Sequence, residues 1–268
     1  MSVFVLTFIV SCSGDDSDEP QSGFHVPSET VKRIDEMFGS QRLDSISFGD
    51  YEIKLRYEGR YLTSYKEFYE KELHDGVSFS LVWDKDTVRI KSSYRTYRAA
   101  IGSNGLVEKL YCPSGKVNTY TYDSDNQLIE YDVELVDIDD NQRMELKWTD
   151  GNVVEAKEIF SDGDYEMYYY TYGNDDNTAA LLPPCRRNCW ITDAGLSWGN
   201  DINIALYYAG LLGKGTANLP IVSRSKWSSG QSGRLCEFEY EIDDDGLVKS
   251  VFDSYWVKYD GKELYFYK

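Results

Sequence analysis

The sequence predicts a mainly β fold, an antiparallel meander of hairpins that forms one large twisted sheet or an open barrel. Three observations support this class. The 268-residue chain carries 23 Tyr and 11 Phe but only six Pro, and aromatic residues favour strands over helices. Several segments alternate apolar and polar side chains with a period of two, as strands with one buried face do. Short turns rich in Asp, Asn and Gly separate these segments, which is typical of hairpins.

The segment Gly115–Glu134 shows this pattern most clearly. Val and Thr alternate with Asn and Tyr up to the polar turn Asp123–Asn126, and a second strand, Leu128–Leu135, follows. Asp and Asn suit the turn because their short side chains bond the local backbone and tolerate a positive φ. The segment therefore predicts architecture, and we expect it to be the unit on which the fold is built.

The same turn pattern recurs along the chain. The segments Ile101–Val107, Tyr122–Leu128 and Ile242–Val248 align without a gap, each with an apolar strand end, a polar bend and an aliphatic restart. Looser copies are Trp148–Val153, Phe160–Gly163 and Tyr259–Lys262. Because the spacing between copies is irregular, we expect a meander of unequal hairpins and not a strict solenoid.

Further strands are predicted by alternation and by the turns around them. They are Tyr51–Tyr57, Arg60–Thr63, Val77–Trp83, Thr87–Tyr97, Leu235–Ile242, Leu247–Tyr259 and Glu263–Tyr267. The segment Tyr65–His74 follows a capping-box spacing at Ser64 and Glu67, which favours a short helix, although a longer strand there is the alternative.

Two segments have helical spacing. Pro27–Gly39 has Ser28 as a candidate N-cap and Gly39 as a stop. Within an insert at Pro183–Val222, Asp201–Gly213 carries apolar residues at helical spacing and ends at a glycine. A helix this apolar must be covered, so we expect it to lie on the sheet or to plug one end of it.

The N-terminal segment has the features of an export signal. Residues 1–11 are apolar and too short to span a bilayer, and Ile9-Val10-Ser11-Cys12 resembles a bacterial lipobox. The resemblance implies cleavage before Cys12 and a lipid anchor on it; an ordinary signal peptide or a buried strand with a chance Cys is the alternative. Met1-Ser2 lacks the basic residues that usually open a signal, which suggests a start further upstream.

Residues 12–23 are polar and acidic, so we expect a tether. This stretch resembles the acidic export signal of surface-exposed Bacteroidetes lipoproteins, which implies the outer face of the outer membrane; a generic solvated linker is the alternative. Residues 24–268 are expected to form a single β-domain and to be a monomer.

The hairpin pattern carries a family resemblance. Tyr120-x-Tyr122-Asp123-x-x-Asn126-x-Leu128 resembles the YD repeat of Rhs-type proteins, with Asn126 where the repeat has Gly. Together with the lipobox, the acidic tether and the Gly-rich insert Tyr207–Lys214, the chain is similar from Leu43 to Lys268 to an uncharacterised family of Bacteroidetes surface lipoproteins. The family implies no activity and no catalytic residues.

Charge and composition limit the function. The chain has 28 basic and 46 acidic residues, a net charge of −18, which repels phosphate backbones and disfavours nucleic-acid binding. With two His and no phosphate-binding loop, we expect no catalytic constellation and no cofactor. Excess carboxylates leave a glycosidase-like hydrolase as an alternative. A Ca²⁺-dependent binding protein, using Asp123 and Asp125 or Asp243–Asp245, is another, although neither is expected to complete a loop with a downstream bidentate Glu at the right spacing.

Four cysteines remain after Cys12. Cys112, Cys185, Cys189 and Cys236 could form one disulfide or stay as buried thiols, with a ring between Cys185 and Cys189 as one option. The spacing of Cys185 and Cys189 and the distance to either His do not favour a metal site, so we expect none.

Aromatic residues near the insert are the candidate ligand site. The strand around residues 165–172 carries rings on both faces, so it is either buried on both sides or presents Tyr to solvent. Exposed Tyr and Trp bind glycans or protein partners, whereas buried ones form core. The candidate ligand-binding residues are Tyr168, Tyr170, Tyr172, Trp190 and Trp198. We therefore expect a non-enzymatic surface module that binds glycan or protein. A transmembrane barrel is the competing interpretation. It is disfavoured because the predicted hairpins lack the uniform apolar outer face that such a barrel needs.

Overall fold

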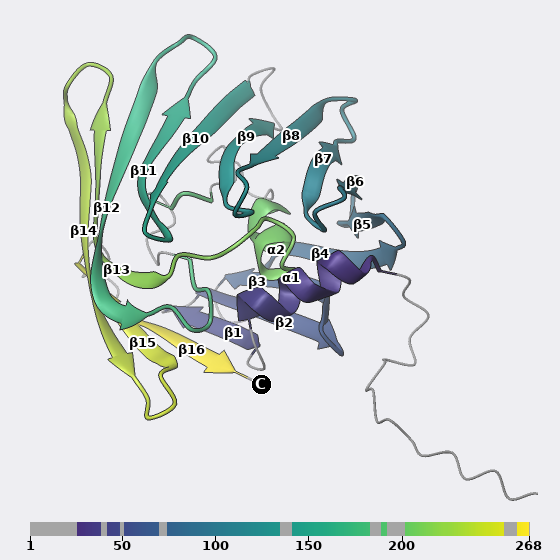
Figure 1. The fold of residues 1–268 in the computed structure, drawn as a ribbon, viewed down its shortest axis with the longest axis horizontal. Helices are drawn as coiled ribbons and strands as arrows, with labels where there is room; N and C mark the ends of the chain where they lie inside the picture. The colour runs from purple at the N-terminus through teal and green to yellow at the C-terminus, as the bar shows by residue number, and fades with distance from the viewer. Residues whose placement is uncertain are drawn as a thin grey trace, which may run out of the picture.

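The fold is a closed antiparallel β-barrel. The computed structural model describes residues 26–38, 42–48, 51–69, 74–134, 141–182, 189–191, 202–254 and 262–267. Within these residues sixteen strands follow one another around the ring in chain order, and β1 pairs with β16 to close it (Figure 1). The predicted antiparallel meander is confirmed; one large twisted sheet or an open barrel was expected, and the sheet forms a barrel that closes.

The helices and strands have the following bounds. The helices are α1 (Ser28–Phe38) and α2 (Ile202–Tyr208). The strands are β1 (Leu43–Phe48), β2 (Tyr51–Glu58), β3 (Tyr61–Tyr69), β4 (His74–Asp84), β5 (Thr87–Lys91), β6 (Thr96–Ile101), β7 (Val107–Tyr111), β8 (Val117–Tyr122), β9 (Leu128–Glu134), β10 (Asn141–Thr149), β11 (Asn152–Ile159), β12 (Tyr165–Asp176), β13 (Asn218–Trp227), β14 (Ser232–Ile242), β15 (Val248–Asp253) and β16 (Lys262–Tyr267).

The strand alternation separates an apolar inner face from a charged outer face. Leu55, Tyr65 and Phe79 lie opposite one another on β2, β3 and β4, and all three are buried. The residues between them point outward, and on most strands these are charged. The outward-facing charged residues include Lys54, Arg56, Lys66, Arg89, Lys91, Arg98, Lys109, Glu130, Asp132, Arg143, Glu145, Lys147, Glu155, Lys157, Arg224, Lys226, Glu237, Glu239 and Lys262.

One turn geometry closes six of the hairpins. In the turn after β8 the Asp123 N–H donates to the Gln127 carbonyl at 3.0 Å, and the Asn126 N–H donates to the Asp123 carbonyl at 3.1 Å. The same pair of bonds occurs at residues 102–106, 112–116, 160–164, 227–231 and 243–247. The fourth residue of each turn has a positive φ, and it is Gly in every case but Asn126. The predicted turns at residues 101–107, 122–128 and 242–248 are confirmed, and their shape explains the recurring Gly or Asn.

Two predictions about local structure are wrong. Residues 65–69 continue strand β3 and do not form a helix, because Tyr65 and Glu67 both face the core while Lys66 faces outward. Tertiary pairing with β2 and β4 therefore prevails over the capping-box spacing. The strand expected over residues 87–97 is two strands, β5 and β6, because Ser92 and Arg95 close a turn between them.

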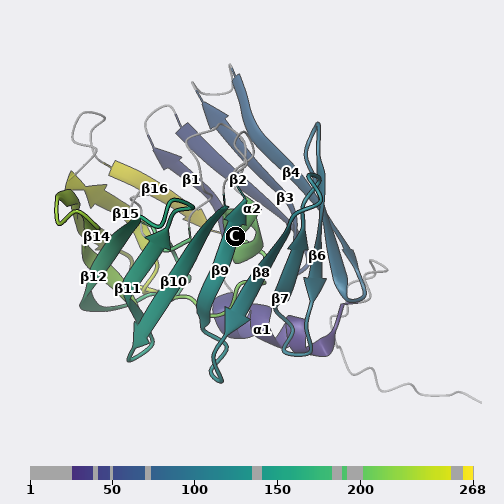
Figure 2. The same ribbon diagram turned by 90° about the horizontal axis from the view of Figure 1, so that it is seen from above.

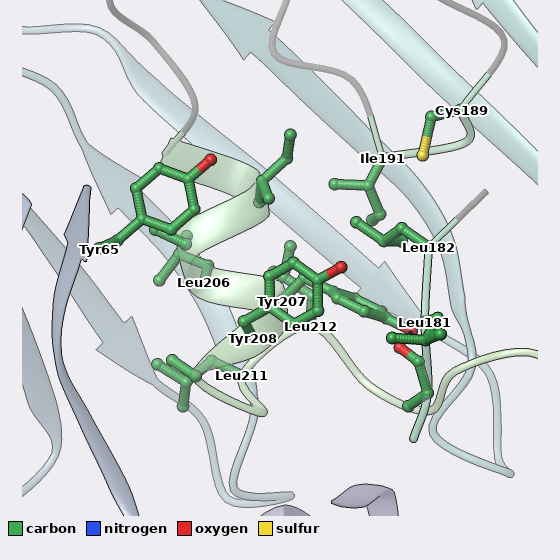
Figure 3. Close-up of a cluster of buried hydrophobic side chains, with 14 of the residues drawn as sticks. Tyr65, Leu181, Leu182, Cys189, Ile191, Leu206, Tyr207, Tyr208, Leu211 and Leu212 are labelled. Carbon is green, nitrogen blue, oxygen red and sulfur yellow. Dashed lines mark hydrogen bonds between the residues drawn. The ribbon is translucent and has the colours of Figure 1, made fainter. Parts of the chain in front are cut away.

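The apolar insert supplies a helix to the barrel core. The predicted helix near residues 201–213 is present as α2, which is shorter because Gly210 and Gly213 both have a positive φ and end the helical path. Every residue of α2 is buried. Figure 3 shows Leu206, Tyr207 and Tyr208 of α2 in one cluster with Tyr65 of β3 and with Leu181 and Ile191. The side chains of the chain itself thus fill this part of the barrel.

The insert also closes one end of the barrel by bonding to hairpin turns. Val107 N–H donates to the Leu211 carbonyl at 3.0 Å, Ala217 N–H to Gly151 O at 2.9 Å, and Thr178 Oγ1 to Gly246 O at 2.8 Å. Helix α1, which matches the predicted helix over residues 27–39, lies across the same end (Figure 2). Its Thr30 hydroxyl donates to the Gly105 carbonyl at 3.0 Å. We call this the helix end, and the opposite end, with the turns at 160–164 and 227–231, the far end.

Candidate functional site

A polar and aromatic cluster lies on the inner face of the wall at the far end. It is formed by Gln142 on β10, Glu158 near the end of β11, Phe160 in the turn that follows, Glu166 and Tyr168 on β12, and Trp227 on β13, and we call it the rim cluster. The register places Met144 opposite Glu158, Glu158 opposite Glu166, and Glu166 opposite Trp227, so these side chains share one face. Strand pairing, and not proximity in sequence, brings them together.

Two carboxylates of the rim cluster meet at one hydroxyl. Tyr168 Oη donates to Glu158 Oε2 at 2.6 Å, and Glu166 Oε2 lies 3.1 Å from the same oxygen. The two carboxylate oxygens are therefore no further apart than the sum of these distances. The remaining oxygen of Glu166 lies against Gly233, where an added Cβ would come within 2.8 Å of Glu166 Oε1. Gly233 thus leaves the space that the Glu166 carboxylate occupies.

The surroundings favour a proton on this pair. Burial raises the pKa of the Glu158 carboxyl; the hydrogen bond from Tyr168 opposes the rise, and the negative charge of Glu166 adds to it. Burial also raises the pKa of the Tyr168 hydroxyl, and the charge of Glu158 adds to that rise. Tyr168 is therefore a neutral donor. The negative charge of Glu166 this close to Glu158 disfavours ionisation of the Glu158 carboxyl.

An unsatisfied amide and a ring stack complete the rim cluster. Gln142 is 9% exposed, and its Oε1 atom is buried without a hydrogen-bond partner. Phe160 and Trp227 are stacked with 5.9 Å between ring centroids and 20° between planes, and Trp227 is 39% exposed. Glu158 and Glu166 are half-buried, so the rim cluster reaches solvent at its Trp227 side.

The geometry suits binding better than glycoside hydrolysis. A retaining glycosidase holds two carboxyl groups about 5 Å apart with the anomeric carbon between them. Glu158 and Glu166 are that close, but the Tyr168 hydroxyl occupies the space between them. The remaining lone pairs of both carboxylates and of Gln142 can accept hydrogen bonds from a ligand.

Of the five predicted ligand-binding residues, Tyr168 belongs to the rim cluster. Tyr170 is buried on the same face of β12, deeper in the barrel, and Tyr172 donates to the Val153 carbonyl at 2.7 Å near the helix end. Trp190 is fully buried, with its ring edge-on to Trp148 and Tyr207 at 5.6 Å each. Trp198 and Cys12 lie outside the described residues, as does the whole segment 1–25.

The aromatic rings on the two faces of strand β12 have different surroundings. Its inner face carries Tyr168 and Tyr170 into the core. Its outer face carries Tyr165 and Tyr169, which are half-buried beneath the cations of Lys157 at 4.7 Å and Arg224 at 5.4 Å from the ring centroids. Long basic side chains cover the outward rings, so neither of the two predicted arrangements applies to the whole strand.

Sequence reasoning missed Gln142, Glu158, Phe160, Glu166 and Trp227. A weak signal was present, because Glu158 and Glu166 occupy positions that alternation assigns to the same face as the buried Ala156 and Tyr168. Charged residues at inward positions of a strand are unusual and mark function or partner contacts. Gln142 and Trp227 offered no comparable signal, because their place depends on the pairing of separate strands.

The acidic turns act as turn formers. Asp123 Oδ1 accepts hydrogen bonds from the backbone of Asp125 and Gln127 at 2.9 Å each, and Asp243 Oδ1 does the same for Asp245 and Leu247 at 3.0 and 2.9 Å. Within the described residues no group of three or more His, Cys, Asp or Glu is placed to hold a metal ion. Cys112, Cys189 and Cys236 are buried, while Cys185 lies outside the described residues, so a Cys185–Cys189 ring stays a prediction.

Comparison with known proteins shows the fold class and no family. The barrel is similar to a porin-like protein from Bacteroides uniformis, with a TM-score of 0.60 and 12% identity over 84% of this chain and 98% of that one. A porin-like protein from Bacteroides vulgatus matches with a TM-score of 0.56 and 14% identity over 85% of this chain and 99% of that one. No family model and no curated protein matches the chain, so the resemblance to YD repeats and to the lipoprotein family is not confirmed. Among the described helices none is long and apolar enough to cross a bilayer.

Proposed function

We propose that this protein is a lipid-anchored, non-enzymatic surface module whose barrel is a rigid scaffold for binding a glycan or a protein. The observation that carries the proposal is the polarity of the wall. Buried apolar side chains, including those of α2, fill the inside, and charged side chains lie on the outside of most strands, beside exposed apolar ones such as Leu235 and Phe266. A barrel with this polarity has its hydrophobic core on the inside and its solvated surface on the outside.

The charged outer wall argues against a lipid-facing barrel. A transmembrane barrel needs an apolar outward band about 25 Å tall, and each Lys or Arg at the bilayer midplane costs roughly 2–4 kcal/mol. Lys54, Arg89 and Lys157 lie in the interior of their strands and point outward. Similar residues occur around most of the ring, so the summed penalty would exceed the stability of an ordinary domain.

The lipobox-like segment would then supply the membrane attachment. Cys12 is the residue that would carry the lipid, and the acidic residues that follow it support a position on the outer face of the outer membrane. A single anchor on a tether leaves the barrel in water, which suits its charged wall.

Fractionation and protease accessibility in a Bacteroidetes host test this proposal. We expect the full chain to fractionate with membranes and to be digested by a protease added to intact cells, while Cys12→Ala is released to the soluble fraction. Ser17→Ala, in the tether, is the matched control and should behave as the unaltered chain. If Cys12→Ala stays in the membrane fraction and requires detergent for release, the barrel itself is the attachment and the proposal is wrong. Glycan-array and pull-down screens on the chain then identify the ligand.

A carboxylate-based hydrolase is the second candidate, favoured by the proximity of Glu158 and Glu166. It predicts turnover of aryl glycosides that is lost in both Glu158→Gln and Glu166→Gln and retained in Glu155→Gln on the outer face of β11. No turnover across a broad aryl glycoside panel would remove this candidate.

A further inference from the structure

The rim cluster is rich in hydrogen-bond acceptors, and its donors besides Tyr168 are the Gln142 side-chain NH2 and the Trp227 indole N–H. Glu158 and Glu166 contribute carboxylate oxygens, and Gln142 contributes an amide oxygen. The Tyr168 hydroxyl has its one proton directed to Glu158. A sugar hydroxyl is both donor and acceptor, whereas an ammonium or guanidinium group is only a donor. The donor and acceptor balance therefore favours a cation.

The unsatisfied Gln142 oxygen is an independent sign of a missing donor. Gln142 lies two residues from Met144, which is opposite Glu158, so alternation places Gln142 on the inner face diagonal to Glu158. Diagonal neighbours of this kind have Cβ atoms about 7 Å apart, within the span of one small ligand. A buried acceptor without a partner costs about 1–3 kcal/mol, which a ligand donor would offset.

The ring stack favours the same ligand. Glu166 is opposite Trp227 in the strand register, and Phe160 stacks on Trp227. An aromatic face attracts a cation with about 0.5–2 kcal/mol, more where water is excluded. Carboxylates and rings that converge on one place thus both attract positive charge.

No described basic side chain contributes to the electrostatics of Glu158. Lys157 and Lys226, which adjoin Glu158 and Trp227 in the chain, lie on the outer face, and the backbone N–H of Arg234 on β14 donates to Ser225 Oγ at 2.9 Å. Ser225 is opposite Tyr168 on the inner face. The charge of the Glu158–Glu166 pair is therefore not balanced by a cation in contact with Glu158 in the described part of the chain.

We propose that the rim cluster binds an organic cation, a primary ammonium or guanidinium group, held by Glu158, Glu166 and Gln142 against the Phe160–Trp227 stack. This site rests on the proposed binding function and names its ligand class. The group comes either from a free amine or from a Lys or Arg side chain of a partner protein, and the two sources share this chemistry.

Isothermal titration of the purified full chain in detergent with n-butylammonium chloride at low salt tests the site. We expect saturable binding with one site per chain, no binding of the neutral isostere 1-butanol, and at least a tenfold loss of affinity in Glu166→Gln and in Gln142→Leu. Glu155→Gln is the matched control, since it makes the same charge change on the outer face of the same hairpin. A Gly-Lys-Gly peptide blocked by N-terminal acetylation and C-terminal amidation, and the same peptide with Nε acetylated, titrated in parallel, distinguish a protein side chain from a free amine.

Three results would overturn the proposal. They are the absence of saturable binding of both n-butylammonium and the lysine peptide, an equal loss of affinity in Glu155→Gln, and equal binding of 1-butanol. An equal loss in Glu155→Gln would indicate only the diffuse attraction of an acidic chain. Thermal melts of each variant separate a lost site from a lost fold. Because titration uses purified protein, its failure is distinct from failure of the membrane-attachment test with Cys12→Ala.

Discussion

The Tyr120 hydroxyl donates a 2.7 Å hydrogen bond to Asn203 Oδ1, across 83 residues of sequence. Tyr120 lies on the inner face of β8, in the hairpin that best shows the repeated pattern, and Asn203 lies in α2. Both residues are buried. This contact joins the regular wall to the insert that fills it, and the inside of the barrel is thus a protein core.

Tyr120→Phe should lower the free energy of unfolding by about 1–3 kcal/mol, because Asn203 Oδ1 loses this donor in a buried place. Denaturant unfolding followed by circular dichroism measures the change. Tyr169→Phe on the outer face is the control, and it should change stability by less than about 0.5 kcal/mol. Equal effects of the two variants would mean that the inner hydroxyl contributes nothing specific.

Gly210→Ala should be more destabilising than Gly115→Ala. Both glycines have a positive φ, at 75° and 90°, so each substitution carries a backbone cost of about 1–2 kcal/mol. At Gly210 the new Cβ would also come within 2.7 Å of Ile34 Cγ1 in α1, whereas at Gly115 nothing lies within 4 Å. The difference between the two unfolding free energies reports the contact of α1 with the segment after α2. Equal unfolding free energies of the two variants would show that α1 shifts to accommodate the new Cβ without a loss of stability.

Asn126 should accept glycine and resist a β-branched residue. Its φ of 62° is the left-handed conformation that its five counterparts satisfy with Gly. We expect Asn126→Gly to leave the melting temperature nearly unchanged and Asn126→Val to cost about 1–2 kcal/mol. The Asn126 carbonyl, which lies 3.4 Å from the Lys214 amide, is retained in both variants. A melting temperature equally lowered in both would point to a role of the Asn side chain.

Glu158→Gln should change how stability depends on pH. The pKa of Glu158 is raised in the fold, so the folded state holds a proton that the unfolded state has released, and stability from this group is lost as pH rises above the ordinary glutamate range. Glu166 and Tyr168 on β12 are the titratable groups that act on it. The difference in melting temperature between the variant and the unaltered chain should therefore be more positive at pH 7.5 than at pH 4.5. Glu155→Gln, on the outer face, should show no such gain at pH 7.5.

Local patterns in the sequence determined much of the wall. The positions of the Gly or Asn turns, the alternation within strands such as β2, and the capped helix α1 follow from the preferences of neighbouring residues, which act within one turn or one strand. The same patterns favoured a helix after Tyr65, and this was wrong because pairing with β2 and β4 outweighs a weak local signal.

Only the tertiary structure decided closure and the rim cluster. Whether a meander stays open depends on the twist summed over all its strands and on the pairing of Ile46 with Tyr265, near opposite ends of the chain. The meeting of Gln142, Glu158 and Glu166 depends likewise on the register of three strands. By itself the sequence determined the hairpins and the charge, and the lipobox-like segment before Cys12 stays a prediction. The fold alone decided that the charged face is the outside and that two carboxylates share one tyrosine within, because sequence periodicity records alternation along a strand but not the side toward which a sheet curls.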